Sequence, residues 1–270
     1  ATSSTALEDG MTFERTDTII PMTVQMLGTF SITIQDTPIK LHATRGLSLL
    51  KYLLFHHKQH TPREVLMDVF WPDSEPETAR NNLNVAMHSL RRALRTTTFL
   101  PIIVFEDGAY GFDPLLQVWI DVEEFERCIK AGQHLEIQNQ LSGAVTEYEI
   151  AVNLYRGDFL ADTPYEGWTV LDRERLRIAY LDTLDHLSQI YFSQERYAAC
   201  ATTCQLILNR DLCREDAHCR LMRCYSRLGQ APLALRQYQI CVEALQSELE
   251  VDPAPETARL YEQLRQHESV

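Results

Sequence analysis

The sequence lacks any uninterrupted apolar run long enough to cross a bilayer, which takes about 20 residues, although 45% of its 270 residues are hydrophobic. It also lacks a secretory signal, because its first ten residues, ATSSTALEDG, offer neither a basic start nor an apolar core. The first residue is not methionine, which suggests a processed chain or a piece of a longer protein. These absences predict no membrane-spanning helix and favour a cytoplasmic location.

Glycine is scarce, with ten residues in the chain, and no glycine-rich loop of the kind that cradles phosphate groups is present. The sequence also lacks the GxSxG turn of serine hydrolases, the HExxH helix of zinc proteases and an aspartate-rich Mg²⁺ loop. Each of these motifs positions a nucleophile, a metal ion or a phosphate. We therefore predict neither enzymatic activity nor a cofactor.

The cysteines do not have the number or spacing of a disulfide framework. There are seven, six of them in the last third of the chain, which indicates reduced thiols. No CxxC pair occurs, and the spacing between Cys200 and Cys204 matches no structural zinc site. His56, His57 and His60 lie at the end of a predicted helix, whose C-terminal dipole favours cations. We predict no metal site, and we interpret the cysteines as small residues between packed helices.

Positive charge is in deficit, because 25 Lys and Arg accompany 38 Asp and Glu for a formal net charge of −13. Taken alone, this balance argues against a nucleic-acid-binding protein. The deficit is uneven, however: residues 24–112 hold nine basic and eight acidic residues, whereas residues 113–270 hold fifteen and twenty-six. A nearly neutral part followed by a strongly acidic part indicates two domains with different partners.

The N-terminal part alternates between strand-like and helix-like patterns. Residues 24–34 alternate apolar and polar side chains before a turn at residues 35–38, which predicts two short strands. A helix is predicted over residues 45–57, and its apolar stripe consists of Leu49, Leu50, Leu53 and Leu54. Thr61, Pro62 and Glu64 predict a capping box for a second helix that ends near residue 70. Residues 102–113 predict two strands around an Asp107–Gly108 turn.

A third predicted helix, residues 78–95, lacks carboxylates altogether in a chain that has 38 of them. At about 3.6 residues per turn, its apolar side chains fall on one face. That face consists of Leu83, Ala86, Met87, Leu90, Ala93 and Leu94. From residue 80 onward, the remaining positions hold asparagine, arginine, histidine and serine, with one valine, Val85.

Two interpretations of this polar face are open. A solvated helix face is common, but it normally includes glutamate for ion pairing, and asparagine is a mediocre helix former. The other interpretation is DNA recognition, since asparagine can bind adenine, arginine can bind guanine or phosphate, and a valine can touch a thymine methyl. Three helices and a hairpin behind a small sheet match a winged helix-turn-helix, whose third helix enters the major groove.

From residue 121 onward the pattern is wholly helical and repeats. Four pairs of residues lie 34 positions apart: Leu187 and Leu221, Tyr191 and Tyr225, Cys200 and Ala234, and Cys204 and Tyr238. A helix-turn-helix period of 34 residues is typical of tetratricopeptide repeats. The spacing of small, aromatic and small residues at Ala234, Tyr238 and Cys241 also occurs at Ala144, Tyr148 and Ala151, which indicates an earlier, less regular unit.

Two sets of motifs, in order over about residues 22–265, resemble a known family. The first set resembles the OmpR-type winged helix of bacterial activators of the antibiotic-regulatory-protein (SARP) type: VQMLGTFSI, LLKYLLFHH, REVLMDVFWPD, ARNNLNVAMHSLRRAL and GAYGF. The second set resembles the bacterial transcriptional activation domain that follows it in that family: WIDVEEFE, YRGDFLAD, Trp168, RERLR and ELEVDPAPET.

The resemblance implies a transcription activator whose third helix reads the major groove of double-stranded DNA. The implied base contacts are Asn81, Asn84, Val85, His88 and Ser89. The implied phosphate contacts are Arg45, Arg63, Arg80, Asn82, Arg91, Arg92, Arg95 and Tyr110. Such proteins bind direct repeats as homodimers and contact RNA polymerase.

The loop between the second and third helices lies where relatives touch the polymerase. The implied contacts are Trp71, Asp73, Glu75 and Glu77, whose carboxylates suit a basic partner; the alternative is a plain acidic turn broken by two prolines. At the hairpin, relatives often carry a basic residue after the tyrosine, whereas Gly111 follows Tyr110 here, and Glu106 and Asp107 occupy the tip. Because carboxylates repel phosphate, we expect no strong hairpin contact with DNA.

We therefore predict an α+β winged helix-turn-helix domain followed by an all-α tetratricopeptide-like domain. The predicted boundaries are a disordered lead-in over 1–21, a DNA-binding domain over 22–112 and an activation domain over 113–268. The predicted function is a DNA-binding transcriptional activator that recruits RNA polymerase, is associated with the bacterial nucleoid and has no membrane partner. The alternative is a protein–protein adaptor or signalling module without specific DNA readout.

Overall fold

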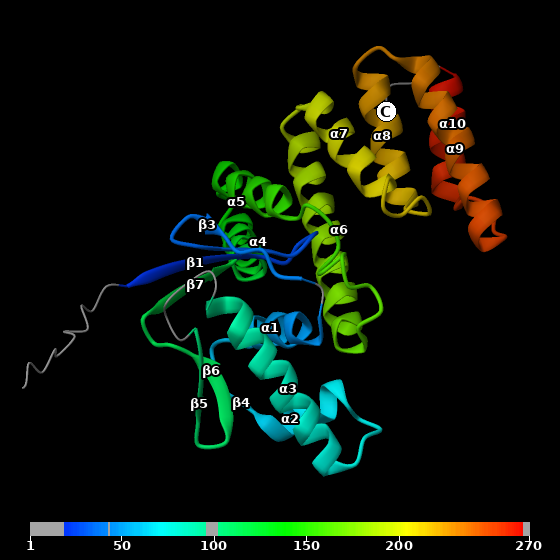
Figure 1. Ribbon diagram of the computed structural model, residues 1–270. Helices are drawn as coiled ribbons and strands as arrows, with labels where there is room; N and C mark the ends of the chain where they lie inside the picture. The colour runs from blue at the N-terminus through cyan, green and yellow to red at the C-terminus, as the bar shows by residue number, and fades with distance from the viewer. Residues whose placement is uncertain (1–18, 43, 96–101, 267–270) are drawn as a thin grey trace, which may run out of the picture. The chain divides into compact units, whose positions relative to one another are not determined.

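A computed structural model describes residues 19–42, 44–95 and 102–266, and the chain divides into two compact units (Figure 1). The N-terminal unit comprises Ala1–Thr23 and Ile32–Trp119, and the helical unit comprises Val24–Ser31 and Ile120–Val270. The predicted fold class, a winged helix followed by a helical repeat domain, is confirmed. The boundaries at residues 112 and 268 stay a prediction. Among the described residues, every helix is too short or too polar to pass through a bilayer.

A four-stranded sheet has the strand order β3–β2–β1–β7. Its strands are β1 (Ile20–Gln25), β2 (Ser31–Ile34), β3 (Thr37–Pro38) and β7 (Leu116–Ile120). Gln35 and Asp36 join β2 to β3 with φ angles of 48° and 62°, as a two-residue type I′ turn requires. The predicted lead-in is wrong for Ile20 and Pro21, which lie in β1, because Ile20 is buried and its N–H donates to the carbonyl of Leu115 at 2.9 Å. Residues 1–18 lie outside the described residues.

Three helices and a second sheet complete the N-terminal unit. The helices are α1 (Arg45–Phe55), α2 (Arg63–Phe70) and α3 (Pro76–Arg95). The sheet has the order β4–β6–β5 and consists of β4 (Thr61–Pro62), β5 (Ile103–Glu106) and β6 (Ala109–Phe112). Asp107 and Gly108 both have positive φ angles, so the predicted hairpin turn between β5 and β6 is confirmed.

The predicted capping box at Thr61 is wrong. Thr61 belongs to β4 and pairs with Tyr110 of β6, and its side chain is buried rather than bonded to the start of α2. Glu64 bonds to the guanidinium of Arg63 at 2.8 Å instead of reaching back along the chain. The pairing of β4 with the hairpin therefore overrides the local capping signal, because it satisfies the backbone of residues 61–62 in a different way.

The core of the N-terminal unit lies between α1 and α3. The four leucines of the predicted stripe on α1 are at most 2% exposed, and burying each leucine contributes about 1.5–3 kcal/mol. On α3 the buried residues are Ala79, Leu83, Ala86, Met87, Leu90 and Leu94. Ala93, predicted as core, is exposed, because the buried stripe passes through Leu90 and Leu94 and leaves position 93 at its edge.

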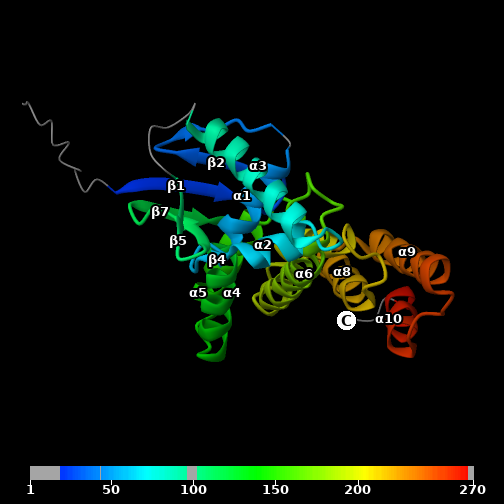
Figure 2. The same ribbon diagram turned by 60° about the horizontal axis from the view of Figure 1, so that its bottom comes forward.

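The helical unit is a series of antiparallel helices that pack in chain order. They are α4 (Asp121–Ile137), α5 (Leu141–Leu154), α6 (Val170–Ser193), α7 (Tyr197–Leu208), α8 (Glu215–Arg227), α9 (Ala231–Leu249) and α10 (Pro255–Arg265), with a short 3₁₀ helix at Gly167–Thr169. Figure 2 shows α4 and α5 side by side as one such pair. The repeat units predicted from the 34-residue spacing therefore correspond to the pairs α6–α7 and α8–α9.

Small residues let these helices approach closely. Cys200, Cys204, Ala234 and Cys241 are all fully buried, so the interpretation as packing residues is confirmed for these cysteines, whereas Cys213 and Cys219 are half-buried. In the earlier unit, Ala144, Tyr148 and Ala151 are buried as predicted. A Cβ atom at Gly132 would lie 2.5 Å from the ring of Tyr148, so glycine is needed on α4 for this tyrosine to pack against it.

Asp121, the first residue of α4, binds the strand segment of the helical unit. Its carboxylate accepts hydrogen bonds from the N–H groups of Met26 (2.8 and 2.9 Å) and Leu27 (2.9 Å). Burial raises the pKa of Asp121 above its ordinary value of 3.8, although these N–H groups oppose the shift. The aspartate in WIDVEEFE therefore has a structural role. It connects the start of α4 to Met26 and Leu27, which lie 95 and 94 positions earlier in the chain.

Arg173 on α6 holds the loop that precedes the helix. Its guanidinium donates to the carbonyl oxygens of Phe159, Leu160, Thr163 and Pro164 and to the Thr169 hydroxyl, at distances from 2.9 to 3.4 Å. Leu160 has a φ angle of 48°, so this loop is bent in a way that a non-glycine residue adopts only with support. The YRGDFLAD and RERLR motifs thus form one structural cluster.

Candidate nucleic-acid interface

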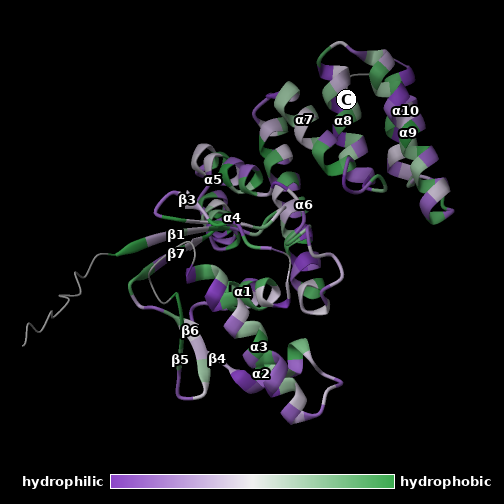
Figure 3. Ribbon diagram, viewed as in Figure 1, coloured by the Kyte–Doolittle hydropathy of each residue, from purple (hydrophilic) through white to green (hydrophobic). Residues whose placement is uncertain are grey.

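The exposed face of α3 contains most of the predicted DNA contacts. Opposite its buried stripe, α3 exposes Arg80, Asn81, Asn82, Asn84, Val85, His88, Ser89, Arg92 and Arg95. Figure 3 shows hydrophilic and hydrophobic residues alternating along this helix. The acidic residue of α3, Glu77, lies in its first turn, so the face from residue 78 to 95 carries donors and cations without a carboxylate. It is therefore suited to an anionic, acceptor-rich surface.

Val85 is the apolar exception on this face. Its side chain is 70% exposed. An aliphatic side chain on a charged helix face does not favour solubility, so its exposure is unusual there. The structure thus confirms that Val85 lies on the polar side of the helix and not in the core. It lies between the asparagines and the flank of α3 that faces α1.

On the opposite flank, Arg91 packs against the β5–β6 hairpin. Its guanidinium donates to the carbonyl of Ile103 at 3.4 Å and lies 5.8 Å from the ring centroid of Tyr110. Tyr110 is 5% exposed and packs against Phe105, and burial raises the pKa of its phenol. Little of the Tyr110 side chain is therefore accessible, and its phosphate contact stays a prediction, while Arg91 is partly occupied by the hairpin.

The α1 flank of α3 borders an open hollow of about 400 Å³. Its lining residues are Thr44, Arg45, Gly46, Trp71, Asn82, Val85, Ala86 and Ser89. A Cβ at Gly46 would lie 3.1 Å from both the Ala86 carbonyl oxygen and the Leu90 Cβ, so glycine lets the start of α1 approach α3 closely. Arg45 lies over the indole of Trp71, 5.9 Å from the ring centroid, and is exposed.

The other basic residues near α1 and α2 differ in how available they are. Lys51 on α1 is fully buried and therefore unsuited to contact a phosphate. Arg63 pairs with Glu64 at 2.8 Å, and this pairing holds the pKa of the Glu64 carboxyl below its usual value. A phosphate would therefore compete with a carboxylate for Arg63.

The loop between α2 and α3 spans residues 71–75 and exposes Asp73 and Glu75. Glu77, predicted in the same loop, belongs to the first turn of α3, where a carboxylate favours the helix dipole. Trp71 does not extend from the loop, because it packs against Phe70 and lines the hollow beside α3. Of the four residues predicted to contact the polymerase from this loop, Asp73 and Glu75 are exposed in the loop, whereas Glu77 lies in α3 and Trp71 packs against the protein.

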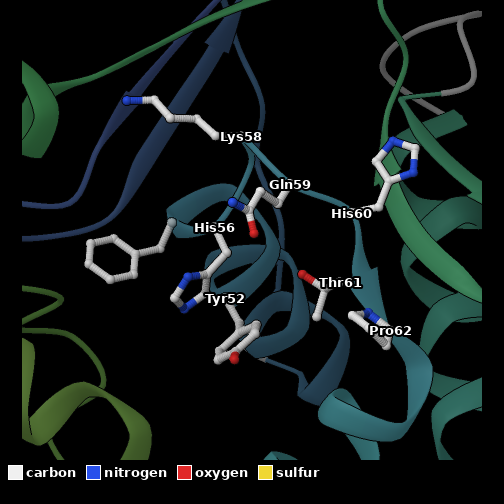
Figure 4. A pocket seen from close by; sticks show the side chains of 8 residues that line it. Tyr52, His56, Lys58, Gln59, His60, Thr61 and Pro62 are labelled. Carbon is white, nitrogen blue, oxygen red and sulfur yellow. The ribbon is translucent and has the colours of Figure 1, made fainter.

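A second hollow of about 400 Å³ lies between the end of α1 and β4 (Figure 4). The rings of Tyr52 and His56 contact each other there at a tilt of 49°, with centroids 4.4 Å apart, while Lys58 extends away from them. The ring of His60 lies across Gly111 of β6, where an added Cβ would come within 2.2 Å of it. His60 therefore occupies the space of the side chain that the hairpin lacks at position 111. None of the predicted base contacts lines this hollow.

Within residues 19–42, 44–95 and 102–266, no group of three or more histidine, cysteine or acidic side chains is arranged to hold a metal ion. The seven cysteines are free thiols. His57 donates through Nδ1 to the carbonyl oxygen of Leu54 in the last turn of α1, at 3.0 Å. This contact agrees with its predicted position at a helix C-terminus.

Two family models match the chain. The model of the bacterial transcriptional activator domain matches residues 120–265, more than half of the chain, and the model described as transcriptional regulatory protein, C terminal, matches residues 36–110. The two matches follow each other in the order that the sequence motifs imply. Both describe parts of transcriptional regulators.

Individual proteins agree with these matches. Regulatory protein DnrI of Streptomyces peucetius is 24% identical over 243 residues, which cover 86% of this chain and 88% of DnrI. The structure of Mycobacterium tuberculosis EmbR, in complex with a low-affinity phosphopeptide, matches with a TM-score of 0.73 at 18% identity and covers 93% of this chain. This chain spans 66% of the EmbR chain, and at that identity the likeness concerns the fold alone. The chain belongs to the bacterial transcriptional activator domain family and is a SARP-type transcriptional regulator with an OmpR-type winged helix.

Proposed function

We propose that this chain activates transcription by binding specific DNA sequences with α3 in the major groove. The observation that carries this proposal is the composition of the α3 surface. Between residues 78 and 95, the side chains outside the buried stripe are exposed or half-buried, and none is acidic. In a chain with a net charge of −13, such a surface fits an anionic partner, and duplex DNA is the partner of this fold.

The residues divide into two roles on this helix. Asn81, Asn84, Val85, His88 and Ser89 lie on the exposed face and are proposed to contact base edges. Asparagine and histidine can donate to or accept from bases, which gives specificity. The proposed phosphate contacts are the exposed Arg45, Arg80, Asn82, Arg92 and Arg95. Arg63 and Arg91 are weaker candidates, because each already has a protein partner.

The proposal extends to two protein partners. We propose that the chain binds direct repeats as a homodimer and that the exposed carboxylates Asp73 and Glu75 contact a basic surface of RNA polymerase. Within the described residues neither carboxylate forms an ion pair, so both are available to a cationic side chain of a partner. Charge reversal of both residues should impair activation while leaving DNA binding unchanged.

The proposal is tested by gel shift with genomic fragments at two salt concentrations. Specific binding should retain a subset of fragments and weaken steeply as salt rises, because each phosphate contact releases counterions. Asn84→Ala and His88→Ala should relax base preference by roughly 1–3 kcal/mol at most, whereas Arg92→Ala should weaken all sequences alike. Asn153 is an exposed asparagine on α5, and Asn153→Ala serves as the matched control. It should change neither base preference nor overall DNA affinity.

The alternative function is a protein–protein adaptor that works through its repeats. One feature favours it: a hollow of about 490 Å³ on α8 and α9 is bordered by Leu233 and Ile240, which are 43% and 40% exposed. An adaptor would retain no DNA fragment at any salt concentration. Equal affinity of the wild type and all α3 variants would likewise remove this helix from the interface.

A further inference from the structure

The hollow on the α1 flank of α3 combines an apolar wall with a polar rim. The apolar wall is formed by Val85, Ala86 and the indole of Trp71, and Gly46 contributes no side chain to fill the space. The rim holds Arg45, Asn82 and Ser89, which are all exposed donors. Apolar contact next to hydrogen-bond donors and a cation is more specific than a general anion site.

We infer that this hollow seats a thymidine of the bound duplex, with the 5-methyl group of thymine against Val85 and Trp71. The inference rests on the proposed function and assigns a base type to one part of the interface. It also assigns Trp71 to DNA recognition. The loop that follows, with Asp73 and Glu75, keeps its proposed role toward the polymerase.

The position of the hollow relative to α3 supports this occupant. A helix in the major groove has a DNA backbone along each flank. The flank of α3 that faces the β5–β6 hairpin is closed by Arg91, which packs on Tyr110. The flank that faces α1 is open. Thymine carries its methyl group on the major-groove edge, on the side nearest the backbone of its own strand. A nucleotide on the open flank therefore brings a methyl group and a phosphate to the same hollow.

The chemistry of the lining discriminates between bases. Cytosine presents an amino donor in the major groove, and Val85 offers it no acceptor. A methyl group buries apolar surface of Val85, which is otherwise 70% exposed to water. Arg45 lies over Trp71 at 5.9 Å and can direct its charge to the phosphate of the same nucleotide. The residues of one hollow thus recognise both ends of one thymidine.

The experiment replaces thymine with uracil, which removes only the methyl group. A duplex is selected from a random library with the full chain, and deoxyuridine is then placed at each thymidine in turn. At one or two positions per half-site, we expect the affinity of the wild type to fall roughly two- to fourfold, the amount that one buried methyl group accounts for. Other thymidines should tolerate the change.

Variants of the hollow connect that loss to these residues. Val85→Ala should bind thymine and uracil duplexes equally at the sensitive positions, and it should fold normally because the side chain is exposed. Trp71→Phe should reduce the difference between the two bases. Val65→Ala, on α2 and outside the hollow, removes the same atoms from a side chain that is 38% exposed, and it should keep the full difference.

The outcomes separate this inference from the proposed function. Specific binding with no uracil-sensitive position would overturn the inference and leave the proposed function intact. A sensitive position that persists unchanged in both Val85→Ala and Trp71→Phe would also overturn it, because the methyl group would then be read elsewhere. Failure to select any duplex would overturn both.

Discussion

Two adjacent arginines of α3 have different environments and should behave differently when replaced. Arg91 donates to the Ile103 carbonyl and lies over the Tyr110 ring, so it fastens the hairpin to the helix. Arg92 is exposed and makes no such contact with the described residues. One position therefore stabilises the fold, and the other is available to DNA.

We expect Arg91→Ala to lower the free energy of unfolding by about 1 kcal/mol, the sum of a modest hydrogen bond and a cation–π contact. Arg92→Ala should leave that free energy unchanged and weaken DNA binding at every sequence. Urea unfolding followed by circular dichroism measures the first effect, and gel shift measures the second. An Arg92→Ala variant that is as destabilised as Arg91→Ala would contradict the assignment.

At this scale the sequence predicts which residues α3 exposes better than what those residues contact. The helical period places Val85 and the asparagines outside the core, because a 20-residue helix has one buried face. It does not predict that Tyr110 is buried or that Lys51 is inaccessible. Those properties depend on neighbours that fold onto the residue from elsewhere in the chain.

Single elements of the helical unit depend on a few polar side chains that tie them together. Arg173 is the clearest case, since its guanidinium satisfies four carbonyls and a hydroxyl of the segment before α6. The planar fork of arginine can reach several acceptors at once, whereas a lysine ammonium is a point charge with three donors. A positive charge at position 173 is thus not sufficient to hold this segment, because several acceptors must be reached at once.

We expect Arg173→Lys to lower the free energy of unfolding by roughly 1–3 kcal/mol, because buried carbonyls lose their donors. Arg177→Lys is the matched control: Arg177 pairs with Glu174 on the exposed side of the same helix at 2.8 Å. An exposed pair contributes about 0–1 kcal/mol. Equal denaturation midpoints for the two variants would show that the loop does not need the fork.

His218 gives α8 a dependence on pH. It is fully buried, with Nε2 2.9 Å from the Leu212 carbonyl and Nδ1 2.7 Å from the Gln237 amide nitrogen. Burial lowers the pKa of His218 below its ordinary 6.5. A base with a lowered pKa in the folded state stabilises the protein above pH 6.5, and that contribution is lost as the pH falls through the folded-state pKa.

We therefore expect the wild type to lose stability between pH 7 and pH 5 more steeply than His218→Gln. Each proton taken up on unfolding changes the free energy by about 1.4 kcal/mol per pH unit. Chemical denaturation at several pH values measures the slope, and His134→Gln, an exposed position on α4, should retain the wild-type slope. Parallel profiles for the wild type and His218→Gln would exclude this histidine as the cause.

Elements with strong local signals are predictable, and elements made by pairing are not. The hairpin at Asp107–Gly108 and the three helices follow from turn residues and apolar periodicity. Strand β4 consists of two residues and forms because it pairs with β6. Its sequence, Thr-Pro before Arg-Glu, has the pattern of a helix start, so only the distant partner decides its structure.

The whole molecule divides its charge between its two ends. The winged-helix part is nearly neutral and exposes its arginines on and beside α3, while residues 113–270 carry the excess of carboxylates. The net charge of the whole chain therefore does not represent the charge of either part. Composition predicts this division, because it can be counted along the sequence, but it does not identify which carboxylates are bonded within the fold, as Asp121 is.

We expect the logarithm of DNA affinity to fall with the logarithm of salt concentration at a slope of about −3.6 for each bound protomer. This value follows if the exposed Arg45, Arg80, Arg92 and Arg95 each neutralise one phosphate, at about 0.9 per contact. Arg92→Ala should reduce the magnitude of the slope by about 0.9. A titration series over four salt concentrations measures it, and a slope near zero would contradict groove binding.

The fully buried cysteines of the helical repeats can be used to measure local opening of the helical unit. Cys200, Cys204, Cys224 and Cys241 have no exposed surface, and burial raises the pKa of Cys241 to about 12. A thiol reagent can reach each of them only when the surrounding helices separate, so each alkylation rate measures the opening of one place along the array. Single-cysteine versions would map, helix by helix, where the activator domain loosens first.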